Sequence, residues 1–250
     1  MQIAGIIPAR FASTRFPGKP LVLINGISMI RRVYEQALKA KSLDTVIVAT
    51  DDERIFEHIM DFGGNVMITA EHHSSGTDRC GEIITKLQKE APASHFDVVV
   101  NIQGDEPFLF PEQIDQLTAS FKNQEVEIAT LARKIDDSEV LFNPNAVKVV
   151  TDAKGFALLF SRAAVPFLRN IPQDKWINNH SFLKHLGIYA YRTEILKEII
   201  QLKPSILEIA ESLEQLRWIE NAYKIKVELT ELESQSVDSP ADLLKLNDLV

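Results

Sequence analysis

Positive charge gathers at the start of the chain. Before the first acidic residue, Glu35, there are five cations, although the net charge of the 250 residues is −8; they are Arg10, Arg15, Lys19, Arg31 and Arg32. The first three lie in PARFASTRFPGKP (residues 8–20), among small residues that let a ligand approach the backbone. Guanidinium and ammonium groups are suited to phosphate oxygens. The segment therefore predicts a polyphosphate site, with a solvated basic loop as the alternative, and Arg31 and Arg32 are expected to be solvated on a helix.

Two common phosphate-binding motifs do not fit this segment. In a P-loop the motif lysine is followed by Ser or Thr, whereas Lys19 is followed by Pro20, and Ser13 stands where the first glycine should be. The dinucleotide fingerprint GxGxxG is also missing, which weakens an oxidoreductase interpretation. The predicted ligand is thus a nucleotide held by another kind of loop.

A carboxylate follows an apolar strand in VVVNIQGDEPF. Asp105 comes directly after Gly104, where a hard cation could be held against a phosphate. The alternative is that Asp105 caps a turn. Asp238 precedes Ser239 and Pro240. From the residues alone it is either a second metal ligand or a carboxylate that stabilises the last helix by interacting with the positive end of its dipole. His72 and His73 have no Cys or third His at zinc-site spacing and are expected to be loop residues.

Alternating strands and helices are expected to position these groups. Apolar runs at residues 3–8, 45–50, 65–70 and 97–103 alternate with helical patterns at 27–41, 52–62, 77–90 and 111–121, which predicts an α/β, doubly wound and mainly parallel sheet. Beyond residue 127 the spacing favours antiparallel or edge strands. Helices are then expected at 193–202 and 207–223, followed by a strand at 224–230 and a helix opened by DSPADL. One domain over residues 1–250, with a smaller lobe around 127–192, is the simplest interpretation.

Composition excludes several classes of protein. Cys80 is the only cysteine, so no intramolecular disulfide forms, and a reducing compartment, the cytoplasm, is expected. No apolar run approaches the ~18 residues of a membrane span. The acidic balance argues against nonspecific nucleic-acid binding, which needs a basic surface.

Taken in order, the motifs resemble a known enzyme family. PARFASTRFPGKPL, SGTDR, NIQGDEP, FNPNAVKVV, FSRAAVPF, HLGIYAYR, LEQLR and VDSPADL together resemble 3-deoxy-manno-octulosonate (KDO) cytidylyltransferases over nearly the whole chain. The resemblance implies a Rossmann-like nucleotidyltransferase fold with a smaller mixed or antiparallel lobe and dependence on Mg²⁺. It also implies transfer of CMP from CTP to KDO, with release of pyrophosphate, for lipopolysaccharide synthesis.

The resemblance also implies roles for individual residues. Lys19, Arg15 and Asp105 would be catalytic, and Asp105 and Asp238 would bind the metal. Nucleotide contacts would come from Arg10, Ser13, Arg15, Lys19, Arg79 and Gln103. The sugar would be bound by Arg162, His185, Tyr189, Glu214 and Gln215, and FSRAAVPFL near an edge could support a homodimer. Taken singly, His185 could equally be a structural histidine and LEQLRW an amphipathic stripe.

Rival functions remain open at this level. An enzyme for the 8-amino analogue of KDO would share almost every motif, and a sialic-acid cytidylyltransferase is disfavoured by HLGIYAYR and EQLR. A nucleotide-binding regulatory protein would not need Lys19, Asp105 and Asp238 together, and a structural interaction protein would leave the N-terminal cations unexplained.

Overall fold

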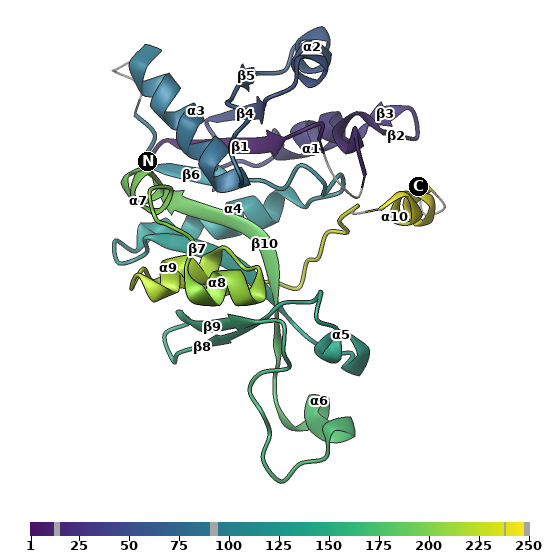
Figure 1. Ribbon diagram of the computed structural model, residues 1–250, viewed down its shortest axis with the longest axis vertical. Helices are drawn as coiled ribbons and strands as arrows, with labels where there is room; N and C mark the ends of the chain where they lie inside the picture. Colours follow the sequence, from purple (N-terminus) through teal and green to yellow (C-terminus); the bar gives the residue numbers. More distant parts are fainter. Residues whose placement is uncertain (13–15, 91–94, 238, 248–250) are drawn as a thin grey trace.

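A single twisted sheet forms the centre of the molecule. The computed structural model describes residues 1–12, 16–90, 95–237 and 239–247, and it orders the main strands as β11-β7-β10-β6-β1-β4-β5 (Figure 1). The strands are β1 (Ile3–Ala9), β4 (Thr45–Thr50), β5 (Val66–Ile68), β6 (Val98–Asn101), β7 (Ile128–Lys134), β10 (Leu183–Arg192) and β11 (Ile225–Leu229). A small hairpin of β2 (Leu23–Ile24) and β3 (Ile27–Ser28) lies apart.

The first half is doubly wound, as predicted. β5, β4, β1 and β6 are parallel neighbours, and β1 and β6 are buried almost throughout because helices cover both faces. The helices contributing to one face are α1 (Met29–Ala37), α2 (Glu53–Asp61) and α4 (Pro111–Ala119). On the other face lie α3 (Gly76–Glu90), α7 (Thr193–Ile199) and α9 (Gln215–Glu220).

β10 agrees with one of the two arrangements expected for this part of the chain. The strand is antiparallel, and it lies inside the sheet, because it pairs with β6 on one side and β7 on the other. A register shift between Leu186 and Tyr189 interrupts its pairing with β7. The second half of the chain is therefore built into the same sheet as the first.

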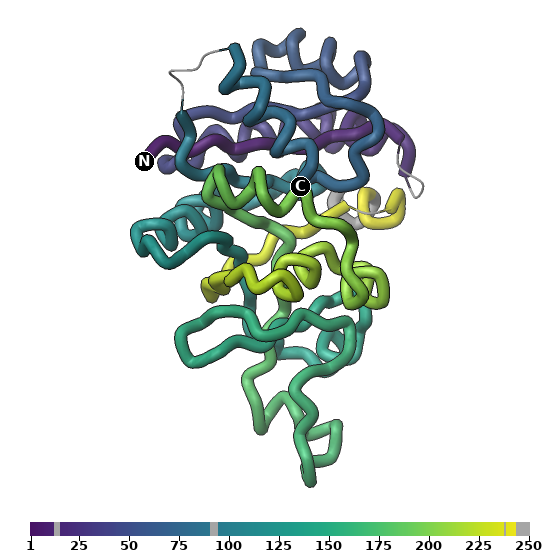
Figure 2. The backbone as a smooth tube through the Cα atoms, turned by 60° about the vertical axis from the view of Figure 1, so that its left-hand side comes forward, coloured from purple at the N-terminus to yellow at the C-terminus, as the bar shows by residue number. Residues whose placement is uncertain are grey.

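Only part of the expected smaller lobe projects from the body. β8 (Lys148–Thr151) and β9 (Ala157–Ser161) form a hairpin that joins the first residues of β10. α5 (Ser138–Phe142) lies at the level of this hairpin, and α6 (Trp176–Asn179) lies further out (Figures 1 and 2). β7 and the second half of β10, which also belong to the range 127–192, lie in the main sheet.

The helix expected at 207–223 is broken in two. α8 (Ile206–Glu211) ends at Ser212, whose φ of 51° is left-handed, and α9 begins three residues later. A capping box between Ser205 and Glu208 starts α8, and Glu208 also binds the guanidinium of Arg217 at 2.5 Å, tying the two helices together. Because of this break, Glu214 stands at the start of α9.

The C-terminal segment returns to the sheet. After β11 the chain runs back to Val237, whose backbone N–H donates to the carbonyl of Asp105 at 2.9 Å. α10 (Pro240–Asn247) follows, and Ser239 and Asp242 make the reciprocal cap that the sequence predicts. Among the described residues no helix combines the length and apolar character needed to cross a membrane.

Candidate active site

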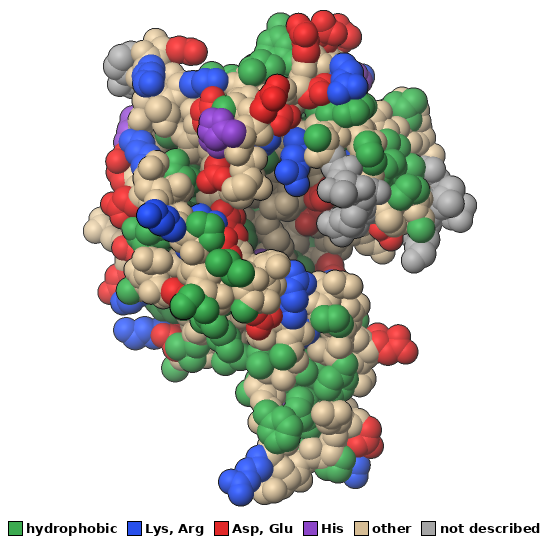
Figure 3. Space-filling model, in the orientation of Figure 1, with side chains coloured by type: hydrophobic (Ala, Val, Ile, Leu, Met, Phe, Trp, Pro, Cys, Tyr) green, Lys and Arg blue, Asp and Glu red, His purple; other side chains and the backbone are tan. Residues whose placement is uncertain are grey.

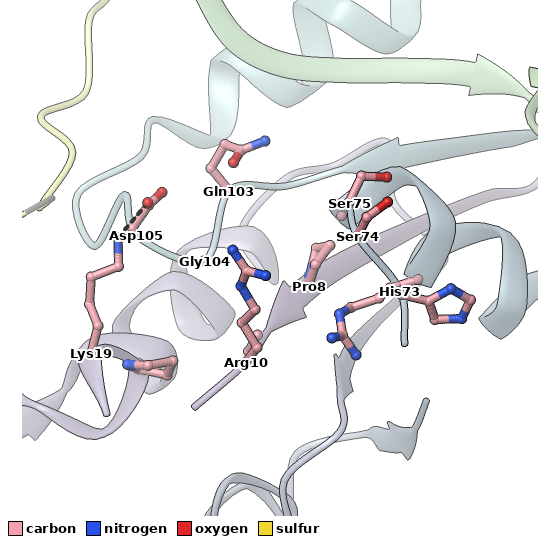
Figure 4. A pocket seen from close by; sticks show the side chains of 13 residues that line it. Pro8, Arg10, Lys19, His73, Ser74, Ser75, Gln103, Gly104 and Asp105 are labelled. Atoms are coloured by element: carbon pink, nitrogen blue, oxygen red, sulfur yellow. Dashed lines mark hydrogen bonds and ion pairs between the residues drawn. The ribbon is translucent and has the colours of Figure 1, made fainter. Parts of the chain in front are cut away.

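A pocket of about 250 Å³ opens at the carboxyl ends of β1 and β6. It brings together five residues that the sequence predicts to act on the nucleotide: Arg10, Lys19, Arg79, Gln103 and Asp105 (Figure 4). Pro8, Ala9, Pro20, His73, Ser74, Ser75, Gly76 and Gly104 complete its lining. Ligands of open α/β sheets bind at this edge, so the pocket lies where the topology places a substrate.

Lys19 and Asp105 form an ion pair at one end of the pocket. Their Nζ and Oδ2 atoms are 2.7 Å apart, and the two side chains are 15% and 28% exposed (Figure 4). A short 3₁₀ turn (Lys19–Leu21) holds Lys19, and Gly18 precedes it with a φ of 70°, a conformation that suits glycine. Arg10 is exposed at the end of β1, whereas Ser13 and Arg15 lie outside the described residues. The structure thus pairs a cation and a carboxylate at the predicted phosphate end.

Gly104 allows two strand ends to meet beneath this pair. A Cβ on Gly104 would lie 2.8 Å from the carbonyl oxygen of Pro8, closer than side-chain carbons approach. Any larger residue would therefore push the loop that carries Asp105 away from β1.

Arg79 also lines the pocket and is largely enclosed. It is 3% exposed, and its Nη2 lies 2.5 Å from Asp51 while Nη1 donates to Thr69 at 2.7 Å. These contacts fix the plane of the guanidinium, so Arg79 acts on any ligand from a preset position.

The loop before α3 was not recognised in full from the sequence. Ser75 caps α3: its hydroxyl accepts from the backbone N–H of Asp78 at 3.1 Å. The hydroxyl of Thr77 instead donates to Glu214 at 2.8 Å, across 137 residues of sequence. His73, Ser74 and Ser75 line the pocket, and the only local signal for this was the run of small polar residues before a helix.

The five residues predicted to bind the sugar do not line this pocket. They are Arg162 after β9, His185 and Tyr189 on β10, and Glu214 and Gln215 at the start of α9. Gln103 joins the two regions, because its Nε2 donates to the carbonyl of Gly187 in the irregular part of β10 at 2.8 Å.

Burial disfavours the charged forms of His185 and Glu214 in this second region. It lowers the pKa of His185 to about 3, so the imidazole is neutral at physiological pH, with Nε2 3.0 Å from the hydroxyl of Thr130. Burial also raises the pKa of Glu214, against the opposing effect of the Thr77 hydroxyl. Neutral donors and acceptors of this kind suit hydroxyl groups.

We expect His185 to make stability depend on pH. The folded pKa of about 3 lies below the ordinary value of about 6.5, so the unfolded state binds more protons between these values and stability falls as the pH falls through that window. Between pH 7 and pH 5.5 the loss due to this group should be about 1 kcal/mol. Denaturant unfolding of the wild type and of His185→Gln measures it as a difference between the two proteins. Burial raises the pKa of Glu106 to about 7, so this group increases the stability of the folded state as the pH falls. Its effect is the same in the wild type and in His185→Gln and therefore cancels in the difference between the two proteins. The same pH dependence in both proteins would contradict the assignment.

The donor set at Asp105 fits a magnesium ion shared with a substrate. Within the described part of the chain, no three His, Cys, Asp or Glu side chains converge as a complete metal site. Mg²⁺ is commonly held by one or two carboxylates together with substrate phosphates and waters, so a complete protein cage is not required. Asp238, the other predicted metal ligand, lies outside the described residues. The backbone N–H of its neighbour Val237 donates a hydrogen bond to the carbonyl of Asp105.

Arg31 is a surface charge on the helix, 43% exposed, as expected, whereas Arg32 is less solvated than expected. Arg31 pairs with Glu35 at 2.7 Å, and Arg32 donates from Nη2 to the carbonyl of Ile24 at 2.6 Å while its guanidinium lies over the ring of Phe108. Both therefore have structural partners away from the pocket.

A wound sheet with a charged pocket at the carboxyl ends of its parallel strands is the arrangement of a nucleotide-binding α/β protein. The model of the family described as cytidylyltransferase matches residues 4–226. The 3-deoxy-manno-octulosonate cytidylyltransferase of Cytophaga hutchinsonii is 52% identical over 98% of this chain and 96% of its own length. The enzyme of that name from Thermodesulfovibrio yellowstonii is 48% identical over 95% of this chain and 94% of its own length. The chain therefore belongs to the 3-deoxy-manno-octulosonate cytidylyltransferase family, as its motifs predicted.

Solved structures agree with this assignment. A CMP:2-keto-3-deoxy-manno-octonic acid synthetase complexed with CTP superposes with a TM-score of 0.90 at 38% identity, covering 100% of this chain and 98% of that one. The 4-diphosphocytidyl-2C-methyl-D-erythritol synthase of Anaerococcus prevotii superposes with a TM-score of 0.61 at 14% identity, over 99% of this chain and 97% of that one. The second likeness shows a shared fold alone.

Proposed function

We propose that this protein transfers CMP from CTP to the anomeric hydroxyl of KDO, forming CMP-KDO and pyrophosphate for lipopolysaccharide synthesis. The observation that carries the proposal is the Lys19–Asp105 pair, set at 2.7 Å in a pocket that also holds Arg10, Arg79 and Gln103. Its relatives at about half identity are named for KDO, which favours this sugar over the 8-amino analogue.

The residues at the phosphate end would neutralise charge. Lys19 and Arg10, with Arg15, would donate to the triphosphate and offset the charge that grows on the departing pyrophosphate. Asp105, with Asp238, would hold Mg²⁺. When bound, the ion would polarise the α-phosphate and lower the pKa of the attacking hydroxyl. Positioning and electrostatics would then supply most of the catalysis, with no covalent intermediate on the protein.

The remaining residues would select the two substrates. Arg79, which lines the pocket, would contact the nucleotide together with Ser13, and Gln103 would stand between nucleotide and sugar. Arg162 would pair with the carboxylate of KDO. The neutral imidazole of His185, with Tyr189, Glu214 and Gln215, would bind its hydroxyls.

A homodimer in the cytoplasm is part of the proposal. Exposed apolar side chains gather on the projecting hairpin, on the loop that follows β9 and on α8, including Leu158, Phe167, Ile206 and Ile209, which are 58–82% exposed (Figure 3). A patch of this kind suits a second copy of the chain. Light scattering that gives the mass of one 28.2 kDa chain at working concentration would contradict it. The single cysteine, a buried free thiol, is consistent with a reducing compartment.

Pyrophosphate release tests the proposed reaction and its metal. We expect the purified protein with CTP, Mg²⁺ and KDO to release pyrophosphate, and EDTA to abolish release until excess Mg²⁺ restores it. Parallel reactions with 8-amino-KDO and sialic acid compare the acceptors. Release with 8-amino-KDO alone would change the proposed acceptor to that sugar. No release with any of the three sugars would indicate a nucleotide-binding protein that does not catalyse this reaction. Activity that survives EDTA would contradict the metal requirement.

A further inference from the structure

Lys148 is buried without an ionic hydrogen-bond partner among the described residues. It lies on β8, is 0% exposed, and donates from Nζ to three backbone carbonyls: Asn143 at 3.0 Å, Ala146 at 2.6 Å and Arg162 at 2.6 Å. Lysine is almost never fully buried unless its charge is compensated. Three carbonyls match the three N–H donors of an ammonium group. The Lys148 side chain therefore links separate chain segments through charge-assisted hydrogen bonds.

The segments tied by Lys148 also hold Arg162. The guanidinium of Arg162 donates to Pro144 at 3.0 Å and to the carbonyl of Glu211 at 2.7 Å. The Glu211 carboxylate accepts in turn from the backbone N–H of Arg162 at 2.8 Å and from the hydroxyl of Ser161 at 2.7 Å. The loop 143–146, the end of β9 and the turn between α8 and α9 therefore form one hydrogen-bonded frame.

The same frame reaches the other residues assigned to the sugar. The carbonyl of Val147, next to Lys148, accepts from the backbone N–H of His185 at 2.9 Å. Glu214 and Gln215 follow directly on the turn that begins at Glu211. Burial lowers the pKa of Lys148 and the charge of Arg162 acts the same way, whereas the Glu211 carboxylate opposes both.

We infer that Lys148 is a positioning residue for the acceptor half of the site: it holds the backbone on which Arg162 and His185 are carried, without touching a substrate. This inference rests on the proposed function, since it assumes that these residues bind KDO. It follows that loss of Lys148 should disturb sugar binding and leave the CTP pocket intact, because Arg10, Lys19 and Arg79 lie on other segments.

The test is steady-state kinetics of Lys148→Met, which keeps the length of the side chain and removes its donors. We expect KM for KDO to rise about 10-fold or more, as loss of charge-assisted hydrogen bonds at a binding frame implies, with KM for CTP within about twofold of the wild type. The matched control is Lys226→Met. Lys226 also donates to a loop carbonyl of the projecting hairpin, that of Lys154 at 2.7 Å, but it lies outside the frame, and both KM values should be unchanged.

A second variant keeps the inference testable if Lys148→Met does not fold. Glu211→Gln leaves Lys148 in place and removes an acceptor of the Arg162 backbone, so KM for KDO should rise several-fold at constant KM for CTP. Wild-type KM for KDO in both folded variants, or equal rises in both KM values, would overturn the inference while the proposed function stands. A wild type that releases no pyrophosphate with KDO would overturn the proposed function and this inference together.

Discussion

Asp105→Asn should lose turnover by about 10³-fold or more while CTP binding weakens far less. The substitution keeps the shape of the side chain but removes the charge that would hold a divalent cation, a contribution worth several kcal/mol in the transition state. Asp105 also accepts from Lys19 at 2.7 Å, so the variant leaves that ammonium with a weaker acceptor. Binding energy that appears mainly in the transition state affects kcat more than ground-state affinity.

Two measurements separate these effects. Pyrophosphate release with saturating CTP and KDO gives kcat, and calorimetric titration with CTP gives the dissociation constant, expected to change by less than about 10-fold. The control is Asp137→Asn, because Asp137 caps α5 through its side chain and asparagine caps equally well. Near-normal turnover in Asp105→Asn would refute the metal role, and an equal loss in Asp137→Asn would show a general sensitivity to such changes.

Lys19→Met should lower kcat/KM by about 10²–10³-fold, the effect of removing one donor from developing charge. Its ammonium lies in the pocket on a short turn and is only 15% exposed, so the charge is held in place before substrate arrives. Methionine preserves much of the side-chain volume, which keeps the turn packed and isolates the loss of charge.

The Lys19 prediction is checked by single-turnover CMP transfer, with Lys39→Met as the control. Lys39 is exposed and donates to Gln36 on the surface, so its loss should change nothing measurable. The double variant Lys19→Met with Asp105→Asn should be less impaired than the product of the single effects, because the two residues form one unit. Wild-type transfer in Lys19→Met would reduce the PGKP segment to a structural turn.

The nucleotide half of the site was predictable because its signals are local. Val98–Asn101 is an apolar run that must be a buried strand, and in a parallel sheet the residues after such strands meet at one edge. That rule alone places Asp105 beside the segment that follows β1, and the structure adds the 2.7 Å contact between Asp105 and Lys19. The small residues of the opening motif, together with Gly104, were the other local features that predicted a ligand site here.

The positions of the residues assigned to the sugar could not be predicted from the sequence, because they depend on contacts between distant segments. The pattern at 207–223 indicates one amphipathic helix, and only the left-handed Ser212 and the Glu208–Arg217 pair divide it and bring Glu214 to Thr77. The sequence likewise shows β10 as a strand without showing that it enters between β6 and β7.

By itself, then, the sequence determined the family, the wound sheet and the strand ends at which Lys19 and Asp105 meet, because periodicity, strand ends and charged loops act over a few residues. The tertiary structure decided how the sugar-side residues are supported. A buried lysine such as Lys148 looks like any other strand residue until three carbonyls from separate segments converge on it. Such convergence is a property of long-range packing, which no local pattern of residue types records.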